Sequence, residues 1–403
     1  MTAMTKTAMT KEEVKSSSQL RVRQEVAPVE STPTKPRICM PSSRMFNRNA
    51  FRGGLYEAQD ILVEADAVDL ICLEPGKSFT FKESWLKRLL YHDVSGRLAF
   101  LNPGLNKVDL RQEYDLFVVS CQFFWDILYI NAIDQWREHC KTSVCWIDEI
   151  WAAAIPHFKY WLHALKRFDH VIVGHSGAVA PLSNAIGREV HWVPGAVDTL
   201  RFSPYPNPPD RVIDVYSVGR RIDAIHRELS TAAGNKKIFY LHDTFQGTAD
   251  AQMYSHRQHR DMFANVAKRA KCFMVAPGKI GDREVRGQVE IGYRYYEGAA
   301  AGTVMIGQAP EIEVFHEMFP WQDAVVHIQP DGSDVLTVLA ELASDFERTA
   351  AIGRTNAAEA LLRHDWIYRW KEVFRIGGLP PSAGMLKREA QLAHLAKIAK
   401  GES

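Results

Sequence analysis

The sequence predicts an α/β protein built from two doubly wound domains with parallel sheets. Its 403 residues are long for one domain and sufficient for two domains that each bury a core. Short β-branched and apolar runs alternate along the chain with longer helical patterns, which is typical of parallel strands joined by helices. A composition of 46% hydrophobic and 24% charged residues fits such a globular protein.

Changes in composition divide the chain into five segments. Residues 1–36 are rich in Thr, Ser, Lys, Glu and Pro, so we expect a disordered tail there. A proline-rich stretch from Pro204 to Pro209 indicates a semi-rigid connector. The predicted segments are the tail at 1–36, an N-terminal Rossmann-like domain at 37–196, a linker at 197–210, a C-terminal Rossmann-like domain at 211–360, and C-terminal helices at 361–403 that could cross back to the first domain.

Charge and apolar pattern argue against several classes of protein. The formal net charge is +1, so we expect no nucleic acid partner. No run of apolar residues is long enough for a transmembrane helix, and the N-terminus lacks the apolar core of a secretory signal. The six cysteines form no Cys-x-x-Cys pair and are expected to be reduced. We therefore expect a cytoplasmic protein, and attachment to a membrane surface stays open.

Polar residues follow the predicted strands of the first domain. We expect strands at 37–41, 68–73, 115–120, 142–147 and 170–173, and helices at 55–64, 125–139 and 155–166. Asp148 and Glu149 follow the fourth of these strands, and His175 follows the fifth. Ligands of open α/β sheets bind at this edge, which makes Asp148 and His175 candidate catalytic or acceptor-side groups. Alternatively, the acidic residues cap the next helix and His175 forms a turn.

Gly53 and Gly54 lie between the first predicted strand and the first predicted helix. Because they have no side chains, they let the backbone approach a ligand and open a helix N-terminus. A plain turn explains the pair equally well. No Gly-x-Gly occurs in the chain, which removes the usual dinucleotide-binding fingerprint.

The second domain repeats the alternation of strand and helix. A strand predicted at 212–218 ends at Gly219, which Arg220 and Arg221 follow. Further strands are expected at 237–242, 272–276 and 324–328, and helices at 254–269, 335–346 and 361–374.

The stretch 289–307 carries the most information about function. Residues 293–301 suit a helix, Gly302 can end that helix in a left-handed conformation, and 303–306 has the pattern of a buried strand. Gly298 and the three alanines that follow it leave one flank of the helix almost without side chains. We therefore expect this helix to lie close against a sheet.

Three charged residues, Glu290, Arg294 and Glu297, stand near the start of this helix, where backbone N–H groups favour anions. With the alanine-rich run from Glu297 to Ile306, they resemble the C-terminal signature of retaining GT-B glycosyltransferases of group 1, family 4. That signature has one Glu in the loop before the helix and a second Glu inside it. Here the two are seven positions apart, one fewer than is familiar.

A second run is similar to the end of the N-terminal domain in the same group of enzymes. In that group a strand leads into Pro-x-Gly-x-Asp and then Phe-x-Pro. Here the corresponding residues are Pro194, Gly195, Asp198, Phe202 and Pro204. Two signatures in the expected order support the GT-B resemblance.

The resemblance implies an enzyme that transfers a hexosyl group from a nucleotide sugar, with retention and without a metal or another cofactor. The acceptor would be a glycan, a lipid-linked molecule or a small molecule. By the same resemblance, Glu297 bonds the nucleotide ribose, Glu290 contacts the donor sugar, and Arg220 or, failing that, Arg221 neutralises the leaving diphosphate.

Other residues of the predicted site follow from the same resemblance. Gly292 and Tyr293 would lie over the phosphate at the helix start, and Lys279 either faces phosphate or is a surface charge. The catalytic candidates are Glu290, Asp148 and His175, and the donor-binding candidates are Gly53, Gly54, Gly219, Arg220, Arg221, Lys279, Gly292, Tyr293, Arg294 and Glu297.

Two other functions stay open. An enzyme of the same fold could epimerise or hydrolyse a nucleotide sugar, which needs carboxylates but no acceptor pocket. Alternatively, the chain is a catalytically inactive protein that binds sugar nucleotides, for which the altered Glu spacing is the main support.

Overall fold

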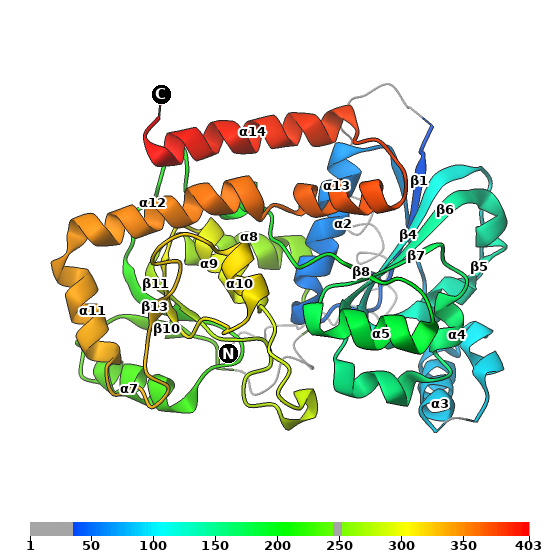
Figure 1. The fold of residues 1–403 in the computed structure, drawn as a ribbon, viewed down its shortest axis with the longest axis horizontal. Helices are drawn as coiled ribbons and strands as arrows, with labels where there is room; N and C mark the ends of the chain where they lie inside the picture. Colours follow the sequence, from blue (N-terminus) through cyan, green and yellow to red (C-terminus); the bar gives the residue numbers. More distant parts are fainter. Residues whose placement is uncertain (1–34, 93, 245–251, 403) are drawn as a thin grey trace, which may run out of the picture. The chain divides into compact units, whose positions relative to one another are not determined.

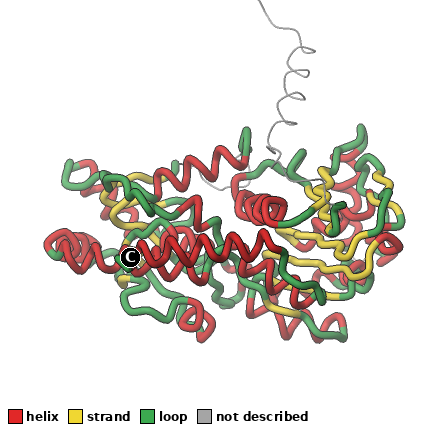
Figure 2. Tube along the Cα trace, turned by 90° about the horizontal axis from the view of Figure 1, so that it is seen from above, coloured by secondary structure: helices red, strands yellow, loops and turns green. Residues whose placement is uncertain are grey.

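The computed structural model describes residues 35–92, 94–244 and 252–402 of the 403-residue chain (Figure 1). The tail predicted to be disordered lies outside the described residues, except for positions 35 and 36. From Pro36 onward the chain forms one compact unit that contains both large sheets. Figure 2 shows their strands in separate groups with helices around them.

The first sheet has six parallel strands in the order β2-β1-β4-β6-β7-β8. The chain places β2 on one side of β1 and then crosses to place β4 on the other side. The position between β1 and β4 is therefore a topological switch point. The bounds are Ile38–Ser42 for β1, Val68–Cys72 for β2, Tyr114–Phe123 for β4, Cys140–Glu149 for β6, His170–Val173 for β7 and His191–Trp192 for β8. A separate two-stranded pair joins β3 (Val108–Asp109) to β5 (Ile133–Asp134).

The second sheet has five parallel strands in the order β10-β9-β11-β12-β13. Its switch point lies between β9 and β11. The bounds are Ile213–Ser217 for β9, Tyr240–His242 for β10, Ala270–Val275 for β11, Val304–Gly307 for β12 and Val326–His327 for β13. The two doubly wound sheets confirm the predicted fold class.

The helices of the first half depart from the prediction in two regions. The single helix predicted at 155–166 is wrong, because the structure has the 3-10 helix η5 (Ala152–Phe158) and then the four-residue helix α4 (Leu162–Leu165). The predicted helix at 125–139 is wrong: the structure has the 3-10 helix η3 (Phe124–Ala132), strand β5 and the 3-10 helix η4 (Trp136–His139). Gln135 interrupts the run in a left-handed conformation, with φ of 50°. The other helices are η1 (Ala50–Arg52), α2 (Gly53–Ala65), α3 (Phe79–Tyr91), η2 (Gly96–Phe100), η6 (Ser176–Ala178), α5 (Val179–Ile186) and α6 (Thr199–Phe202).

The second half also has one predicted helix that the structure divides. The segment 361–374 is split between α12 (Phe346–Arg363) and α13 (Trp366–Ile376), because the side chain of Asp365 accepts from the N–H of Ile367 and caps a new helix. The remaining helices are α7 (Asp223–Gly234), α8 (His256–Ala267), η7 (Arg283–Val285), α9 (Tyr293–Ala300), α10 (Glu313–Met318), α11 (Val335–Ser344) and α14 (Ala383–Lys400).

The C-terminal helices pack on both halves of the chain. Helix α14 lies along α12 (Figure 1), and its preceding Ser382 donates from Oγ to the carbonyl of Ala65 in α2. In α13, the indole of Trp370 donates to the carbonyl of Ala58, and Trp366 and Trp370 both pack edge-on against Trp146 of the first sheet. Residues from α2, α13, α14 and the first sheet therefore share one apolar core.

Candidate functional site

The site predicted at 289–307 lies beside the switch point of the second sheet. Gly292, in an extended conformation, is the N-cap of α9, and the helix packs on β11 and β12. A Cβ atom at Gly298 would lie 3.0 Å from Met305 Cγ and 3.0 Å from Phe273 Cδ1. The bare flank therefore allows the close packing that the sequence predicts.

The carboxylate of Glu297 lies between two arginines. Its side chain is 2% exposed, its Oε1 accepts from Arg260 Nη1 at 2.5 Å, and its Oε2 accepts from Arg294 Nη1. Arg294 comes from the first turn of α9 and also donates from Nε to the carbonyl of Val218, the residue after β9. Glu297 and Arg294 are thus brought together at the end of β9.

Arg260 is a site residue that sequence reasoning missed. It is buried in α8, and its Nε and Nη2 donate to the two oxygens of Glu57 in α2, at 2.7 and 3.2 Å. Burial opposes its charge, but the carboxylates of Glu57 and Glu297 hold the pKa of the guanidinium above its ordinary value. No local pattern could have identified Arg260, because its partners are 203 and 37 positions away.

Arg220 and Arg221, which follow β9, pair with groups other than Glu297. Arg220 is half exposed and pairs with Asp282 at 3.0 Å. Arg221 donates to the carbonyl of Asp243 at 3.0 Å and lies beside His242. Gly219, with φ of +84°, forms the turn at the strand end, and its N–H donates to Asp243 Oδ2 at 2.6 Å.

Glu290 connects the two halves of the chain. It is buried and accepts four hydrogen bonds: from the N–H and Oγ of Ser176, from the N–H of Gly177, and from the amide of Gln288. A carboxylate has about four lone-pair positions, so Glu290 has no free acceptor in this arrangement. A Cβ atom at Gly177 would lie 2.9 Å from Glu290 Oε1, so glycine is needed here.

Asp148 lies at the end of β6 and is held by two donors. Tyr293 donates from its hydroxyl to Asp148 Oδ1 at 2.6 Å, and Gln122 donates to Oδ2 at 2.7 Å. Burial, the largest influence, raises the pKa of Asp148 to about 6, although the bonds from Tyr293 and Gln122 and the charge of His175 act in the opposite direction. A carboxyl group with such a pKa can exchange protons near neutral pH.

His175 and Lys279 both lie close to the ring of Trp151, near the end of β6. The His175 ring is 4.5 Å from the Trp151 ring, and its Nδ1 is 3.1 Å from the carbonyl oxygen of Ile150. The ammonium of Lys279 is 5.2 Å from the Trp151 ring and pairs with Glu149 at 2.7 Å. Lys279 therefore contacts an acidic residue of the first half.

Gly53 and Gly54 make room for side chains of this site. A Cβ atom at Gly53 would lie 3.2 Å from Arg260 Cδ, and one at Gly54 would lie 3.2 Å from the ring of Tyr293. Gly195 faces the same ring from another segment, at 3.1 Å. These glycines let Arg260 and Tyr293 approach the first half of the chain.

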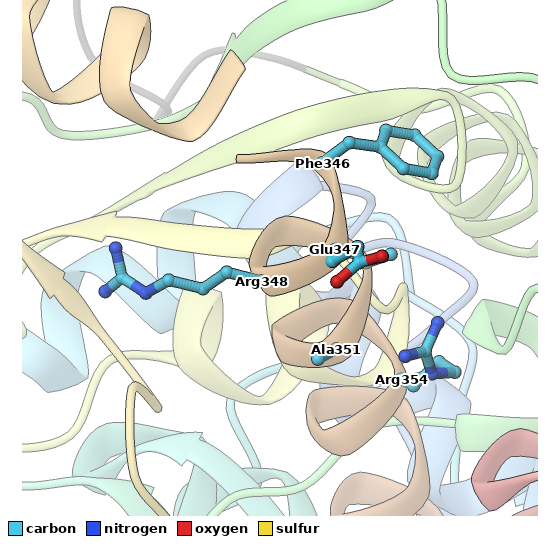
Figure 3. A pocket seen from close by; sticks show the side chains of 6 residues that line it. Phe346, Glu347, Arg348, Ala351 and Arg354 are labelled. Atoms are coloured by element: carbon cyan, nitrogen blue, oxygen red, sulfur yellow. The ribbon is translucent and has the colours of Figure 1, made fainter. Parts of the chain in front are cut away.

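Other features of the described residues lie apart from this site. An open hollow of about 560 Å³ at the start of α12 has Arg348 and Arg354 on opposite sides (Figure 3), and no predicted site residue lines it. Across residues 35–92, 94–244 and 252–402, no group of three or more His, Cys, Asp or Glu side chains is placed to hold a metal ion. None of the helices described is long and apolar enough to cross a membrane.

The two parallel doubly wound sheets, with polar residues gathered at the strand ends, define a GT-B fold. The sequence matches no protein-family model and no curated protein. Among solved structures, the chain resembles an alpha-glucosyltransferase in complex with UDP-glucose and DNA containing an abasic site, with a TM-score of 0.52, 13% identity, and coverage of 86% of this chain and 100% of that one.

Two further structures of an alpha-glucosyltransferase show the same likeness. One is in complex with UDP and a 13-mer DNA containing a HMU base, with a TM-score of 0.53, 11% identity, and coverage of 85% of this chain and 99% of that one. The other is in complex with UDP, with a TM-score of 0.51, 13% identity and the same coverages of 85% and 99%. At these identities the likeness concerns the fold.

These structures correct one expectation. From the net charge of +1 we expected no nucleic acid partner. That exclusion is wrong, because glucosyltransferases with this fold are solved in complex with DNA. The net charge is a sum over the whole chain, so a value near zero does not exclude a local positively charged surface that binds nucleic acid.

Proposed function

We propose that this protein is a glycosyltransferase that uses a nucleotide sugar as its donor. The observation that carries the proposal is the position of Glu297, Arg294 and Gly219 together at the end of β9, at the switch point of the second sheet. Open α/β sheets bind nucleotides at such points. A carboxylate suits the ribose hydroxyls, and an arginine beside a glycine turn suits a diphosphate.

The chemistry required of these residues is stabilisation of the leaving diphosphate. Negative charge develops on the diphosphate as the glycosidic bond breaks, and Arg294 and the N–H groups in the first turn of α9 would stabilise it there. In this proposal no metal or other cofactor takes part. Retention of configuration and a hexosyl donor are further parts of the proposal, based on the signature at Glu290 and Glu297.

Asp148 is our candidate for a group that moves a proton. Its pKa of about 6 lets it accept a proton at neutral pH, and its hydrogen bond to Tyr293 places it beside the first turn of α9. In this proposal Glu290 contributes indirectly, because its four hydrogen bonds hold the loop before α9 against Ser176 and Gly177.

A thermal-shift screen with UDP, GDP, ADP and TDP sugars tests the proposal. A ligand that binds the folded chain raises its melting temperature by mass action, so one series should stabilise the protein. Glu297→Ala should abolish that response, and exposed Glu228→Ala should leave it unchanged. If no nucleotide sugar shifts the melting temperature, the proposal fails.

Transfer is tested with the donor that the screen selects. The acceptors to be compared are glycans, lipid-linked saccharides, small molecules and DNA, the last because the similar structures hold it. Release of free nucleotide that depends on one acceptor supports transfer. Release or epimerisation without acceptor indicates the hydrolase or epimerase alternative.

A protein that binds sugar nucleotides without transferring sugar is the second candidate. Its support is that Glu290, which the family signature assigns to the donor sugar, has all its acceptor positions occupied within the chain. Stabilisation by a nucleotide sugar without turnover on any acceptor would favour this candidate.

A further inference from the structure

The two arginines that bind Glu297 differ in how firmly they are held. The side chain of Arg260 is 5% exposed and is fixed by two carboxylates. The side chain of Arg294 is 31% exposed and has one carboxylate partner, Glu297. Arg260 is therefore held in place by Glu57 as well as by Glu297, whereas Arg294 can turn toward solvent.

Arg294 also lies where an anionic ligand would be. An ideal Cβ atom at Gly219 would lie 3.6 Å from Arg294 Nη2, so the guanidinium rests directly on the glycine turn after β9. Its Nε donates to the carbonyl of Val218 at 3.2 Å. A phosphate at this turn would be within reach of Arg294 after a small rotation of the side chain, because the guanidinium already lies there.

A ribose hydroxyl has no access to Glu297 while both arginines lie against it, because the Glu297 side chain is buried under them. Its carboxylate is 2% exposed, and Arg294 covers Oε2. A ribose hydroxyl could reach Oε2 once Arg294 has moved. The displaced guanidinium loses its anionic partner, which a nucleoside does not replace and a nucleoside diphosphate does.

We propose that Arg294 is an exchangeable counterion of Glu297, whereas Arg260 is its permanent anchor. In the ligand-free protein Arg294 neutralises Glu297. When a nucleoside diphosphate binds, ribose hydroxyls replace Arg294 on Oε2, and Arg294 moves to the diphosphate beside Gly219. Arg260 keeps Oε1 throughout and holds the carboxylate ionised and oriented. This inference rests on the proposed function.

The exchange gives the site a preference for phosphorylated nucleosides over bare nucleosides. Binding of a nucleoside breaks the pair between Arg294 and Glu297 without replacing it, whereas binding of a diphosphate replaces one charged hydrogen bond by another. Arg294 is therefore a specificity-determining residue, and Arg260 is a positioning residue that acts through Glu297. The two residues should respond differently to substitution.

The test compares the dissociation constants of UDP and uridine by isothermal titration calorimetry, or of the matching pair if the screen selects GDP, ADP or TDP. Arg294→Met should weaken UDP binding about tenfold or more and leave uridine binding equal or tighter. Arg260→Lys should weaken both ligands by a similar factor and keep their ratio. Exposed Arg227→Met removes a charge elsewhere in the same half and should change neither constant.

The ratio of the two constants does not depend on global stability, so a loss of folding free energy in Arg260→Lys does not obscure it. The exchange would be overturned if Arg294→Met left the ratio of the UDP and uridine dissociation constants unchanged, either because both ligands were weakened equally or because neither was weakened. If the parent protein binds none of the four nucleoside diphosphates, the proposed function itself fails. These two failures are distinguishable, because the first requires that the parent protein binds UDP or its counterpart.

Discussion

Tyr293 donates a 2.6 Å hydrogen bond to Asp148 and so joins the first turn of α9 to the end of β6. The carboxyl group is buried, and burial raises its pKa to about 6 from an ordinary value of 3.8. Between these two values the folded protein holds a proton that the unfolded chain has lost. Stability therefore falls as pH rises through this window, and the loss is complete above pH 6.

Asp148→Asn should remove this pH dependence. Two pKa units correspond to about 3 kcal/mol, so the unfolding free energy of the variant relative to the parent should rise by roughly that amount between about pH 3 and about pH 7. Urea denaturation at several pH values measures the difference. Exposed Asp210→Asn is the matched control and should follow the parent curve. Parallel curves for Asp148→Asn and the parent would contradict the prediction.

Loss of the Glu290 carboxylate should be costly for stability. Glu290→Ala removes the carboxylate that accepts from the N–H groups of Ser176 and Gly177, and the loss of a hydrogen bond to a charged group costs about 1.5–3 kcal/mol. We expect destabilisation of about 3 kcal/mol in urea. Exposed Glu228→Ala should change stability by less than about 0.5 kcal/mol. A value for Glu290→Ala as small as the control would show that these bonds contribute little.

The sequence predicted much of the fold because its signal is local. The strand expected at 170–173 is β7 (His170–Val173), and the helix expected at 293–301 differs by one residue from α9 (Tyr293–Ala300). Both follow from hydrophobic periodicity and glycine stops. The predicted helix at 125–139 failed because the chain leaves the helical conformation at strand β5 (Ile133–Asp134), which left-handed Gln135 follows.

The partners of the site residues could not be predicted in the same way. Sequence reasoning named Glu297 but not its partner Arg260, because this pair forms only when distant elements pack. Whether the carboxylate of Glu297 is free or paired depends on such contacts. A family signature identifies a position, and the packing decides which groups that position contacts.

Arg388, whose side chain is 11% exposed, should be important for attachment of α14. It donates to both oxygens of Asp365, at 2.8 Å each, and to Asp198 at 2.6 Å. Arg388→Met leaves the buried carboxylate of Asp365 without its counterion, while Asp198 keeps Arg201, and breaking such a pair typically costs about 3–5 kcal/mol. Arg375→Met is the control, because the Arg375 side chain is 70% exposed in its pair with Glu372. Thermal and urea denaturation should separate the two variants, and equal stabilities would refute the role of Arg388.

Gly298 should tolerate no larger residue, because α9 lies too close to its sheet. A Cβ atom there would lie 3.0 Å from Phe273 Cδ1, and Phe273 is fully buried between elements that cannot easily move. Gly298→Val adds further atoms to this contact, and overpacking of a core costs about 1–3 kcal/mol.

Gly234, also helical, has open space where a Cβ atom would be. Gly234→Val therefore carries the same helix-propensity cost without the clash, and urea denaturation should show Gly298→Val to be less stable than Gly234→Val by about 2 kcal/mol. If the two variants were equally stable, α9 would have room to move away from the sheet, and the position of Glu297 and Arg294 would not depend on this packing.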